Sequence, residues 1–266
     1  MLKITEKNVK SILSKTKLGS DFVINPYTGC MHKCIYCYAR FMQKYSNHNE
    51  PWGSFLDIKI NAPELIKNNT KCTHKSILIS SVTDPYQPIE IRYQLTRKIL
   101  KKLIPLQPKL QIITKSDLVL RDMDLLKQFK NCEIAISLSC ADESLSKQLE
   151  PLAISPIRRI SALKQLRENS IKTIVFISPI FPEISDWKGI VKTTKSFVDE
   201  YWFENLNLYH FIKKNVYDFL KKFNPRLIKI YDEIYSKKSD YWIKTEQEIK
   251  EFCDKEKIIG KIYFHY

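Results

Sequence analysis

The feature that most constrains the fold of this chain is a repeated alternation of short apolar runs with amphipathic stretches. Six apolar runs are typical of strands: Phe22–Asn25, Ser76–Ser81, Leu110–Thr114, Glu133–Ser139, Ile171–Ser178 and Tyr201–Leu208. Most are continuously apolar, as expected for parallel strands covered on both faces. The stretches between them repeat apolar residues at helical spacing, for example at Ile91, Leu95, Ile99 and Leu103.

Strands that alternate with helices imply right-handed βαβ units and a parallel sheet. Six units are too few to close an eight-stranded barrel. We therefore expect an α/β fold, an open, partial (β/α)6 barrel of the TIM type. Ser116 or Asp117 and, further on, Asp142 are suited to cap the helices that follow the third and fourth strands.

The pattern changes beyond about Tyr209, where Lys-rich helical stretches cover 211–222 and 240–255. Asn224-Pro225 interrupts them, and a short strand is expected within Lys257–Phe264. We therefore expect a core domain at 1–210, which includes a short N-terminal extension, and a C-terminal helical appendage at 211–266 packed on it.

Composition excludes several classes of protein. Of the 266 residues, 44% are hydrophobic, which is too many for a disordered tail. No apolar run approaches the roughly 20 residues that span a bilayer. The first residues contain no apolar segment of the signal-peptide kind. We expect a soluble, cytoplasmic protein without a membrane partner.

The chain is strongly basic, with 44 Lys and Arg against 29 Asp and Glu, a net charge of +15. Such a charge makes nucleic acid a candidate partner. The charge is mostly Lys and is spread from Lys3 to Lys261 rather than gathered in one stripe, as codon bias alone can produce.

Three of the seven cysteines, Cys30, Cys34 and Cys37, lie within eight residues in the spacing C-x3-C-x2-C. In a reducing compartment such a trio indicates a metal or cluster site rather than disulfides. Gly29 permits the tight bend that the loop needs. The other four cysteines, Cys72, Cys132, Cys140 and Cys253, are scattered and suit apolar packing.

Two metal chemistries compete for the trio. An iron–sulfur cluster held by three Cys, with one iron left open, fits it directly. A structural zinc site wants a fourth ligand, for which the sequence offers His32 inside the loop or distant residues such as His74. A non-catalytic, metal-stabilised binding module therefore stays an alternative to an enzyme.

The segment around the trio, Asn25-Pro-Tyr-Thr-Gly-Cys-Met-His-Lys-Cys-Ile-Tyr-Cys-Tyr-Ala-Arg40, follows the first predicted strand. It resembles the radical S-adenosylmethionine (radical SAM) superfamily, and within it the spore photoproduct lyase-like (SplB-related) group. Three further segments share the resemblance, which runs from about residue 22 to 205: Val82–Glu90, Ile113–Ser116 with Arg121-Asp122, and Leu149-Glu150-Pro151 with Arg159.

The resemblance implies an enzyme with two cofactors. Cys30, Cys34 and Cys37 would bind three irons of a [4Fe–4S] cluster, and the fourth iron would take the amino and carboxylate groups of SAM. One electron, from a flavodoxin- or ferredoxin-type donor, would cleave SAM to methionine and a 5′-deoxyadenosyl radical that abstracts a hydrogen atom from the substrate.

Polar residues at the ends of the predicted strands are candidates for binding SAM, because functional residues gather at the C-terminal ends of barrel strands. Lys115 is assigned to the SAM carboxylate. The amino and hydroxyl groups of SAM are assigned to the hydroxyl and carboxyl side chains of Ser81, Thr83, Asp84, Ser137 and Ser139. The alternative for Asp84 and the hydroxyls is that they cap turns.

The resemblance also gives roles to Tyr36 and Tyr38, which flank the third cysteine. Tyr36 would shelter the adenine of SAM. Tyr38 would take part in radical transfer, or form an aromatic wall that keeps the cluster dry. Four ionisable residues, by contrast, are expected to form salt bridges of the scaffold: Arg121, Asp122, Glu150 and Arg159.

One departure separates the chain from spore photoproduct lyase itself. That enzyme has a hydrogen-donating cysteine after its second strand, where this chain has Ser81. A serine O–H is a much poorer hydrogen-atom donor than a thiol. Cys140, just past the fourth strand, is a candidate substitute. The sequence therefore predicts a lyase-like radical SAM enzyme with a different substrate, and a nucleic-acid repair or modification enzyme is the alternative.

Overall fold

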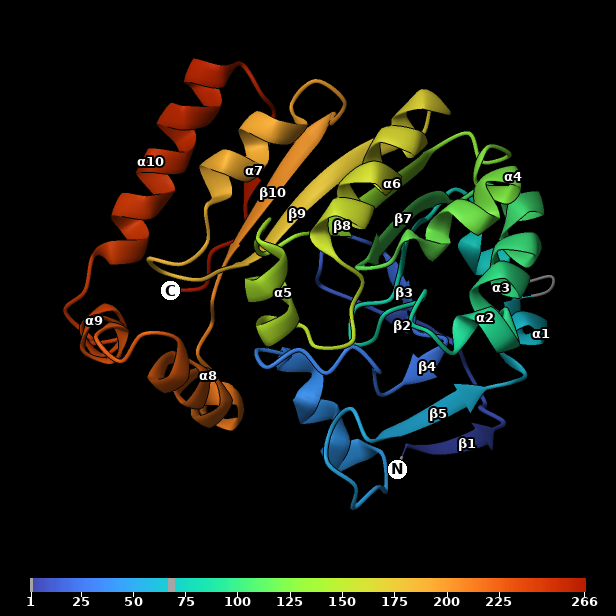
Figure 1. The fold of residues 1–266 in the computed structure, drawn as a ribbon. Coiled ribbons are helices and arrows are strands. Elements are labelled where there is room, and N and C mark those ends of the chain that lie inside the picture. The colour runs from blue at the N-terminus through green and yellow to red at the C-terminus, as the bar shows by residue number, and fades with distance from the viewer. Residues whose placement is uncertain (1, 67–69) are drawn as a thin grey trace.

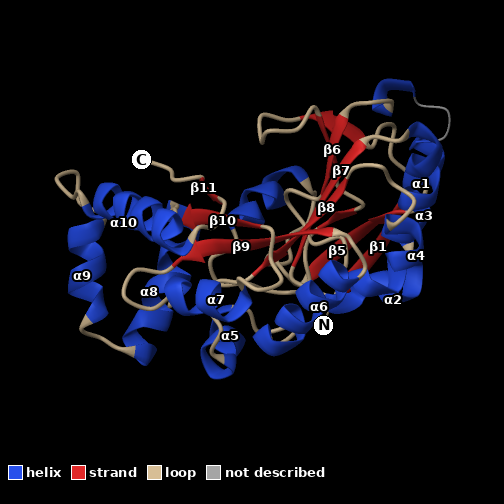
Figure 2. Cartoon of the chain, turned by 90° about the horizontal axis from the view of Figure 1, so that it is seen from above, coloured by secondary structure: helices blue, strands red, loops and turns tan. Residues whose placement is uncertain are grey.

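The computed structural model describes residues 2–66 and 70–266, and its largest element is an eight-stranded sheet (Figures 1 and 2). The strand order is β11-β10-β9-β8-β7-β6-β3-β2. The strands are β2 (Leu13–Lys15), β3 (Phe22–Ile24), β6 (Ser76–Ile79), β7 (Lys109–Thr114), β8 (Cys132–Ser137), β9 (Lys172–Ile180), β10 (Glu200–Asn205) and β11 (Gly260–Ile262). Every neighbouring pair is parallel except β2 and β3.

Helices connect the parallel strands, as the sequence predicts. The α-helices are α1 (Ala62–Ile66), α2 (Glu90–Tyr93), α3 (Leu95–Leu103), α4 (Met123–Leu126), α5 (Glu143–Leu149), α6 (Pro156–Glu168) and α7 (Trp187–Thr194). Short 3₁₀ helices occur at η1 (Tyr38–Tyr45), η2 (Thr70–Cys72), η3 (Ile104–Leu106) and η4 (Asp117–Asp122). The open, partial (β/α)6 barrel is therefore confirmed, and its six parallel strands, β3 and β6 to β10, are the six that the apolar runs predict.

Local details follow from capping and burial. The Ser116 and Asp142 side chains accept hydrogen bonds from the backbone N–H of Leu118 and Leu145, so both expected caps form. The helical face expected after the second strand is wrong at Ile91, which is 65% exposed. Gln94 takes a left-handed conformation with φ of 50°, which separates α2 from α3 and turns Ile91 outward.

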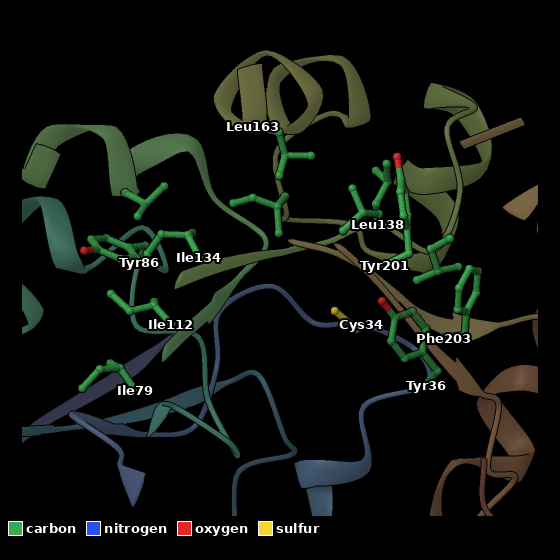
Figure 3. Close-up of a cluster of buried hydrophobic side chains, with 14 of the residues drawn as sticks. Cys34, Tyr36, Ile79, Tyr86, Ile112, Ile134, Leu138, Leu163, Tyr201 and Phe203 are labelled. Atoms are coloured by element: carbon green, nitrogen blue, oxygen red, sulfur yellow. The ribbon is translucent and has the colours of Figure 1, made fainter. Parts of the chain in front are cut away.

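The core fills the space between the strands and their helices. Ile112, Ile134 and Leu163 are fully buried in it. Figure 3 shows that Cys34 and Tyr36 lie on the other side of the strands from Leu163 of α6. The cysteine loop therefore packs against the inner face of the partial barrel, and the helices cover the outer face.

A second, three-stranded sheet stands beside the barrel, with the order β1-β5-β4. It consists of β1 (Lys3–Lys7), β5 (Phe55–Lys59) and β4 (Tyr27–Thr28). These three strands are not among those predicted from the sequence, and the Lys-Ile-Thr-Glu-Lys of β1, in the expected N-terminal extension, is mostly polar and largely exposed. Parallel pairing with the buried β5 orders it. The sheet matters for the site because β4 leads directly into the cysteine loop.

The C-terminal residues form α8 (His210–Phe223), α9 (Leu227–Ile234) and α10 (Tyr241–Glu256), followed by β11. Two of these helices and the strand are expected from the sequence, whereas α9 is an addition. β11 pairs with β10 and so joins the tail to the edge of the sheet (Figure 2). The domain boundary at residue 210 stays a prediction. No helix in the described ranges is both long and apolar enough to cross a membrane.

Candidate active site

The cysteine loop runs from β4 to η1 and carries three free thiols within eight residues. Cys30 and Cys34 are buried and Cys37 is half-buried. The loop bends at Gly29, whose φ is +95°, a value that side chains disfavour. A Cβ atom at Gly29 would lie 2.5 Å from the carbonyl oxygen of Phe55, so the loop crosses β5 at a distance that only glycine allows.

Loops of the barrel hold this segment in place. Thr83 Oγ1 donates to the Gly29 carbonyl oxygen at 2.6 Å, and Gln87 Oε1 accepts from the Met31 N–H at 2.9 Å. On the other side, the Ile35 N–H donates to the Leu149 carbonyl oxygen at 2.9 Å. The cysteines are therefore fixed between the segments that follow β6 and β8.

The donor set fits an iron–sulfur cluster. His32 is buried, and its Nδ1 lies 3.4 Å from Asp84 Oδ2. His74 is exposed in the loop before β6, at the opposite end of that strand from the cysteines. Within 2–66 and 70–266, no three His, Cys, Asp or Glu side chains are grouped as ligands of a single metal ion. Three thiols on one loop are the ligands that a multi-iron cluster takes.

Asp84 connects the ends of β6 and β7. Its carboxylate accepts hydrogen bonds from Thr114 Oγ1 and the Lys115 N–H, both at 2.7 Å, and from the Tyr86 N–H at 2.9 Å. The residue is buried, with 6% of its surface exposed. These bonds hold the backbone at the mouth of the barrel, which is the turn-capping alternative considered for this residue. Thr83 likewise has a structural partner, because its hydroxyl donates a hydrogen bond to the Gly29 carbonyl oxygen.

Lys115 points into the mouth of the barrel. Its Nζ donates to Ser137 Oγ at 2.9 Å, across from the end of β7 to the end of β8, and lies 5.7 Å from the centre of the Tyr36 ring. Burial lowers the pKa of Lys115, but the Cys34 sulfur and the Glu150 carboxylate raise it by more. The ammonium group is therefore charged and close to the cysteine loop.

Tyr36 is part of a buried hydrogen-bonded group. Its hydroxyl lies 3.1 Å from Ser139 Oγ and donates to Glu150 Oε1. Ser139 Oγ also donates to Glu150 at 2.9 Å, and Arg159 Nη2 lies 2.5 Å from Glu150 Oε2. Burial raises the pKa of Glu150, but Arg159 and Lys115 together lower it to about 2. Glu150 is therefore an ionised anchor for Tyr36.

The other expected scaffold ion pairs also form. Arg121 Nη2 lies 2.8 Å from both Glu90 Oε1 and Asp122 Oδ2, and both carboxylates are buried. Arg97 adds a second guanidinium to Asp122 at 2.8 Å. This network joins α2, α3 and η4 on the outer side of the barrel. Together with the Glu150–Arg159 pair, it shows that the four residues expected to form scaffold salt bridges do form them.

Tyr38 and Cys140 differ in their access to the mouth of the barrel. Tyr38 is 41% exposed, and its hydroxyl donates to the Ser81 carbonyl oxygen. Ser81 in turn donates its backbone N–H to Asn25 Oδ1 at 2.9 Å. Cys140 is buried, and its thiol contacts the Asp142 carbonyl oxygen at 3.6 Å. Tyr38 therefore has the more accessible side chain of the two.

Sequence reasoning missed a polar group at the ends of β9 and β10. Ser178 Oγ donates to Glu204 Oε2, and His265 Nε2 lies 3.3 Å from Glu204 Oε1. Burial raises the pKa of the Tyr38 phenol, and the charge of the Glu204 carboxylate raises it further. The only sequence signal for this group was Glu204, a carboxylate within the apolar run Tyr201–Leu208. Its partner His265 lies 61 residues further along the chain.

Glu204 is expected to hold His265 in its protonated form. The hydrogen bond to Glu204 raises the pKa of His265 above its usual range. The stabilisation of the C-terminal residues is therefore complete below the unfolded-state pKa and is lost as the pH rises through the raised one. An NMR titration of the imidazole checks this, and Glu204→Gln is expected to lower the pKa. An unchanged pKa in that variant would contradict the pairing.

Comparisons with known proteins agree with this geometry. The model of the radical SAM superfamily matches residues 24–192. An uncharacterized protein of Methanocaldococcus jannaschii is 47% identical over 208 residues, 78% of this chain and 79% of that protein. A radical SAM Nα-GlyT isomerase of Pseudomonas phage M6 is 26% identical over 163 residues, 60% of this chain and 33% of that protein.

Solved structures show the same fold. Spore photoproduct lyase with a dinucleoside spore photoproduct gives a TM-score of 0.73 at 14% identity, over 98% of this chain and 82% of that one. SuiB of Streptococcus suis bound to S-adenosylmethionine gives 0.60 at 16% identity, over 92% and 50%. With the family match over more than half of its length, the chain belongs to the radical SAM superfamily.

Proposed function

We propose that this protein is a radical SAM enzyme of the lyase-like group that cleaves S-adenosylmethionine reductively at a [4Fe–4S] cluster. The observation that carries the proposal is the set of three free thiols on one anchored loop, with the Lys115 ammonium beside it. When bound, the cluster and SAM supply a one-electron cleavage that starts radical chemistry on a substrate. A structure of spore photoproduct lyase with bound AdoMet, TM-score 0.72, supports this assignment at the level of the fold.

The residues of this chain bind and orient the two cofactors. Cys30, Cys34 and Cys37 hold the cluster, and Lys115 pairs with the carboxylate of SAM. Hydroxyls at the mouth of the barrel and the Tyr36 ring contact the rest of SAM. Thr83 and Asp84 position the cysteine loop and Lys115 through the hydrogen bonds they already make. The hydroxyls that we assign to SAM belong to Ser81, Ser137 and Ser139.

Tyr38 and Cys140 are the residues that we assign to the substrate side. The exposed Tyr38 ring lies beside Ser81, where spore photoproduct lyase has its hydrogen-donating cysteine. Because Ser81 replaces that cysteine, we infer a substrate other than a thymine dimer. The charge of +15 favours nucleic acid as the second candidate substrate class. Binding of DNA or RNA that weakens steeply with salt would support it.

The proposed setting follows from the chemistry. The reaction requires a one-electron donor, for which we propose a flavodoxin or ferredoxin. All seven cysteines are free, which suits a reducing, cytoplasmic compartment. Any donor must approach the cysteine loop closely enough to pass an electron to the proposed cluster.

The test is anaerobic reconstitution with iron and sulfide, followed by reduction with SAM and chromatography for 5′-deoxyadenosine. Wild type is expected to form it, and Cys34→Ala is expected to lose both the cluster and the product. Cys253→Ala is a matched control, because Cys253 is also a buried free thiol but lies in α10. A wild type that assembles no cluster and copurifies with one zinc would replace the proposal with a metal-stabilised binding module.

A further inference from the structure

Trp52 lies against the cysteine loop without any role assigned so far. It belongs to the turn that leads into β5 and is 5% exposed. Its ring packs edge-on against Phe55, with centroids 5.7 Å apart at 85°. Cys30, Ala39 and Phe55 form one buried cluster with it, and Cys37 packs on this cluster. The indole is therefore a wall of the space around two of the three thiols.

Among the described residues, the indole N–H of Trp52 is a buried polar group that has no hydrogen-bond partner. Leaving such a buried donor unpaired is unfavourable, because it has lost its hydrogen bond to water. The Cys37 side chain packs on the buried cluster that contains this indole. Burial raises the pKa of the Cys37 thiol, whereas the Ala39 backbone N–H and the Trp52 N–H lower it.

The turn that carries Trp52 is fixed on both sides. The Ser54 N–H donates to the Pro51 carbonyl oxygen at 2.9 Å, and the Lys3 N–H donates to the Ser54 carbonyl oxygen at 3.0 Å. Gln43 Nε2 of η1 donates to the Glu50 carbonyl oxygen at 2.9 Å. The small β1-β5-β4 sheet and η1 therefore hold the indole in place beside the loop, which suits a residue that has to keep one orientation.

We propose that Trp52 is a positioning residue that donates an N–H···S hydrogen bond to the cluster-ligating sulfur of Cys37 and raises the reduction potential of the cluster. The inference rests on the proposed function. Reduction adds negative charge to the cluster and its thiolates, and a hydrogen-bond donor stabilises that charge. The apolar ring also excludes water from the same side.

The first test compares the reduction potential of the reconstituted cluster in wild type, Trp52→Phe and Trp242→Phe. Phenylalanine keeps an apolar ring and removes the donor. Trp242 is the matched control: its N–H is also buried and unpaired among the described residues, but it lies in α10, which Figures 1 and 2 show well away from β5. At a fixed potential, Trp52→Phe is expected to raise the oxidised-to-reduced ratio roughly tenfold, about 59 mV for a one-electron couple.

A second measurement does not depend on the variant folding. Wild type with ¹⁵N-indole tryptophan is reduced, and pulsed electron paramagnetic resonance is used to look for a ¹⁵N coupling to the cluster. The coupling is expected in wild type and Trp242→Phe. Its absence, or an unchanged potential in Trp52→Phe, would overturn the role of Trp52 alone. Failure of wild type to assemble any cluster would overturn the proposed function together with this inference.

Discussion

Replacing Arg159 with methionine is expected to lower the free energy of unfolding by about 3–5 kcal/mol, because it leaves the Glu150 carboxylate buried without its guanidinium. Glu150 is 2% exposed and Arg159 is 1% exposed. Arg159 also donates to the Ser137 and Ile154 carbonyl oxygens at 3.1 and 2.9 Å. The loss therefore affects the end of β8 as well as the carboxylate. Urea unfolding of the metal-free protein under anaerobic conditions measures the effect.

The neighbouring residue supplies the control. Arg158 forms an ion pair with Asp117 at 2.6 Å, but its side chain is 60% exposed. Exposed pairs contribute little, so Arg158→Met is expected to change the unfolding free energy only slightly. Equal effects of the two substitutions would contradict the assignment of Arg159 as the partner of a buried charge. They would also remove the reason to regard Glu150 as an ionised anchor for Tyr36.

The six barrel strands were predictable because each is a short apolar run buried by its neighbours, and periodicity reports burial. The side sheet was not, since β1 is polar and is ordered by pairing with β5, in which Phe55, the partner of Lys3, lies 52 residues further along the chain. α9 was not predicted because Asn224-Pro225, directly before it, indicates an interruption of the helical pattern.

The site was predictable in the same uneven way. The spacing of three cysteines carries chemical information within one loop, so the sequence alone indicates a cluster. The hydrogen-bond partners of Thr83 and Asp84 depend on which loops meet in space. No local sequence pattern predicts that the Thr83 hydroxyl donates to the Gly29 carbonyl oxygen. Glu204 and His265, and the indole of Trp52 beside Cys37, are likewise joined only by the fold.

Gly29→Ala is expected to reduce the iron bound after anaerobic reconstitution roughly tenfold or more, because about 2–5 kcal/mol of strain falls on the cysteine loop. The left-handed φ of +95° accounts for part of this strain. The contact of the new Cβ with the Phe55 carbonyl oxygen accounts for the rest, since β5 is paired on both sides and cannot move freely. Iron and sulfide content per chain, together with the visible absorbance of the cluster, measure the loss.

Gly19→Ala is the control for a left-handed glycine elsewhere in the chain. Gly19 also has a positive φ, +78°, but a Cβ there would meet no atom within 4 Å. This variant carries the conformational strain without the contact, and it lies outside the cysteine loop, so its iron content is expected to match that of wild type. If Gly29→Ala bound as much iron as Gly19→Ala, the close crossing of the loop over β5 would not be needed to position the three thiols for cluster binding. If only Gly29→Ala lost iron while both variants stayed folded, the loop's backbone path would be a requirement of the site in its own right, beyond the presence of the three cysteines.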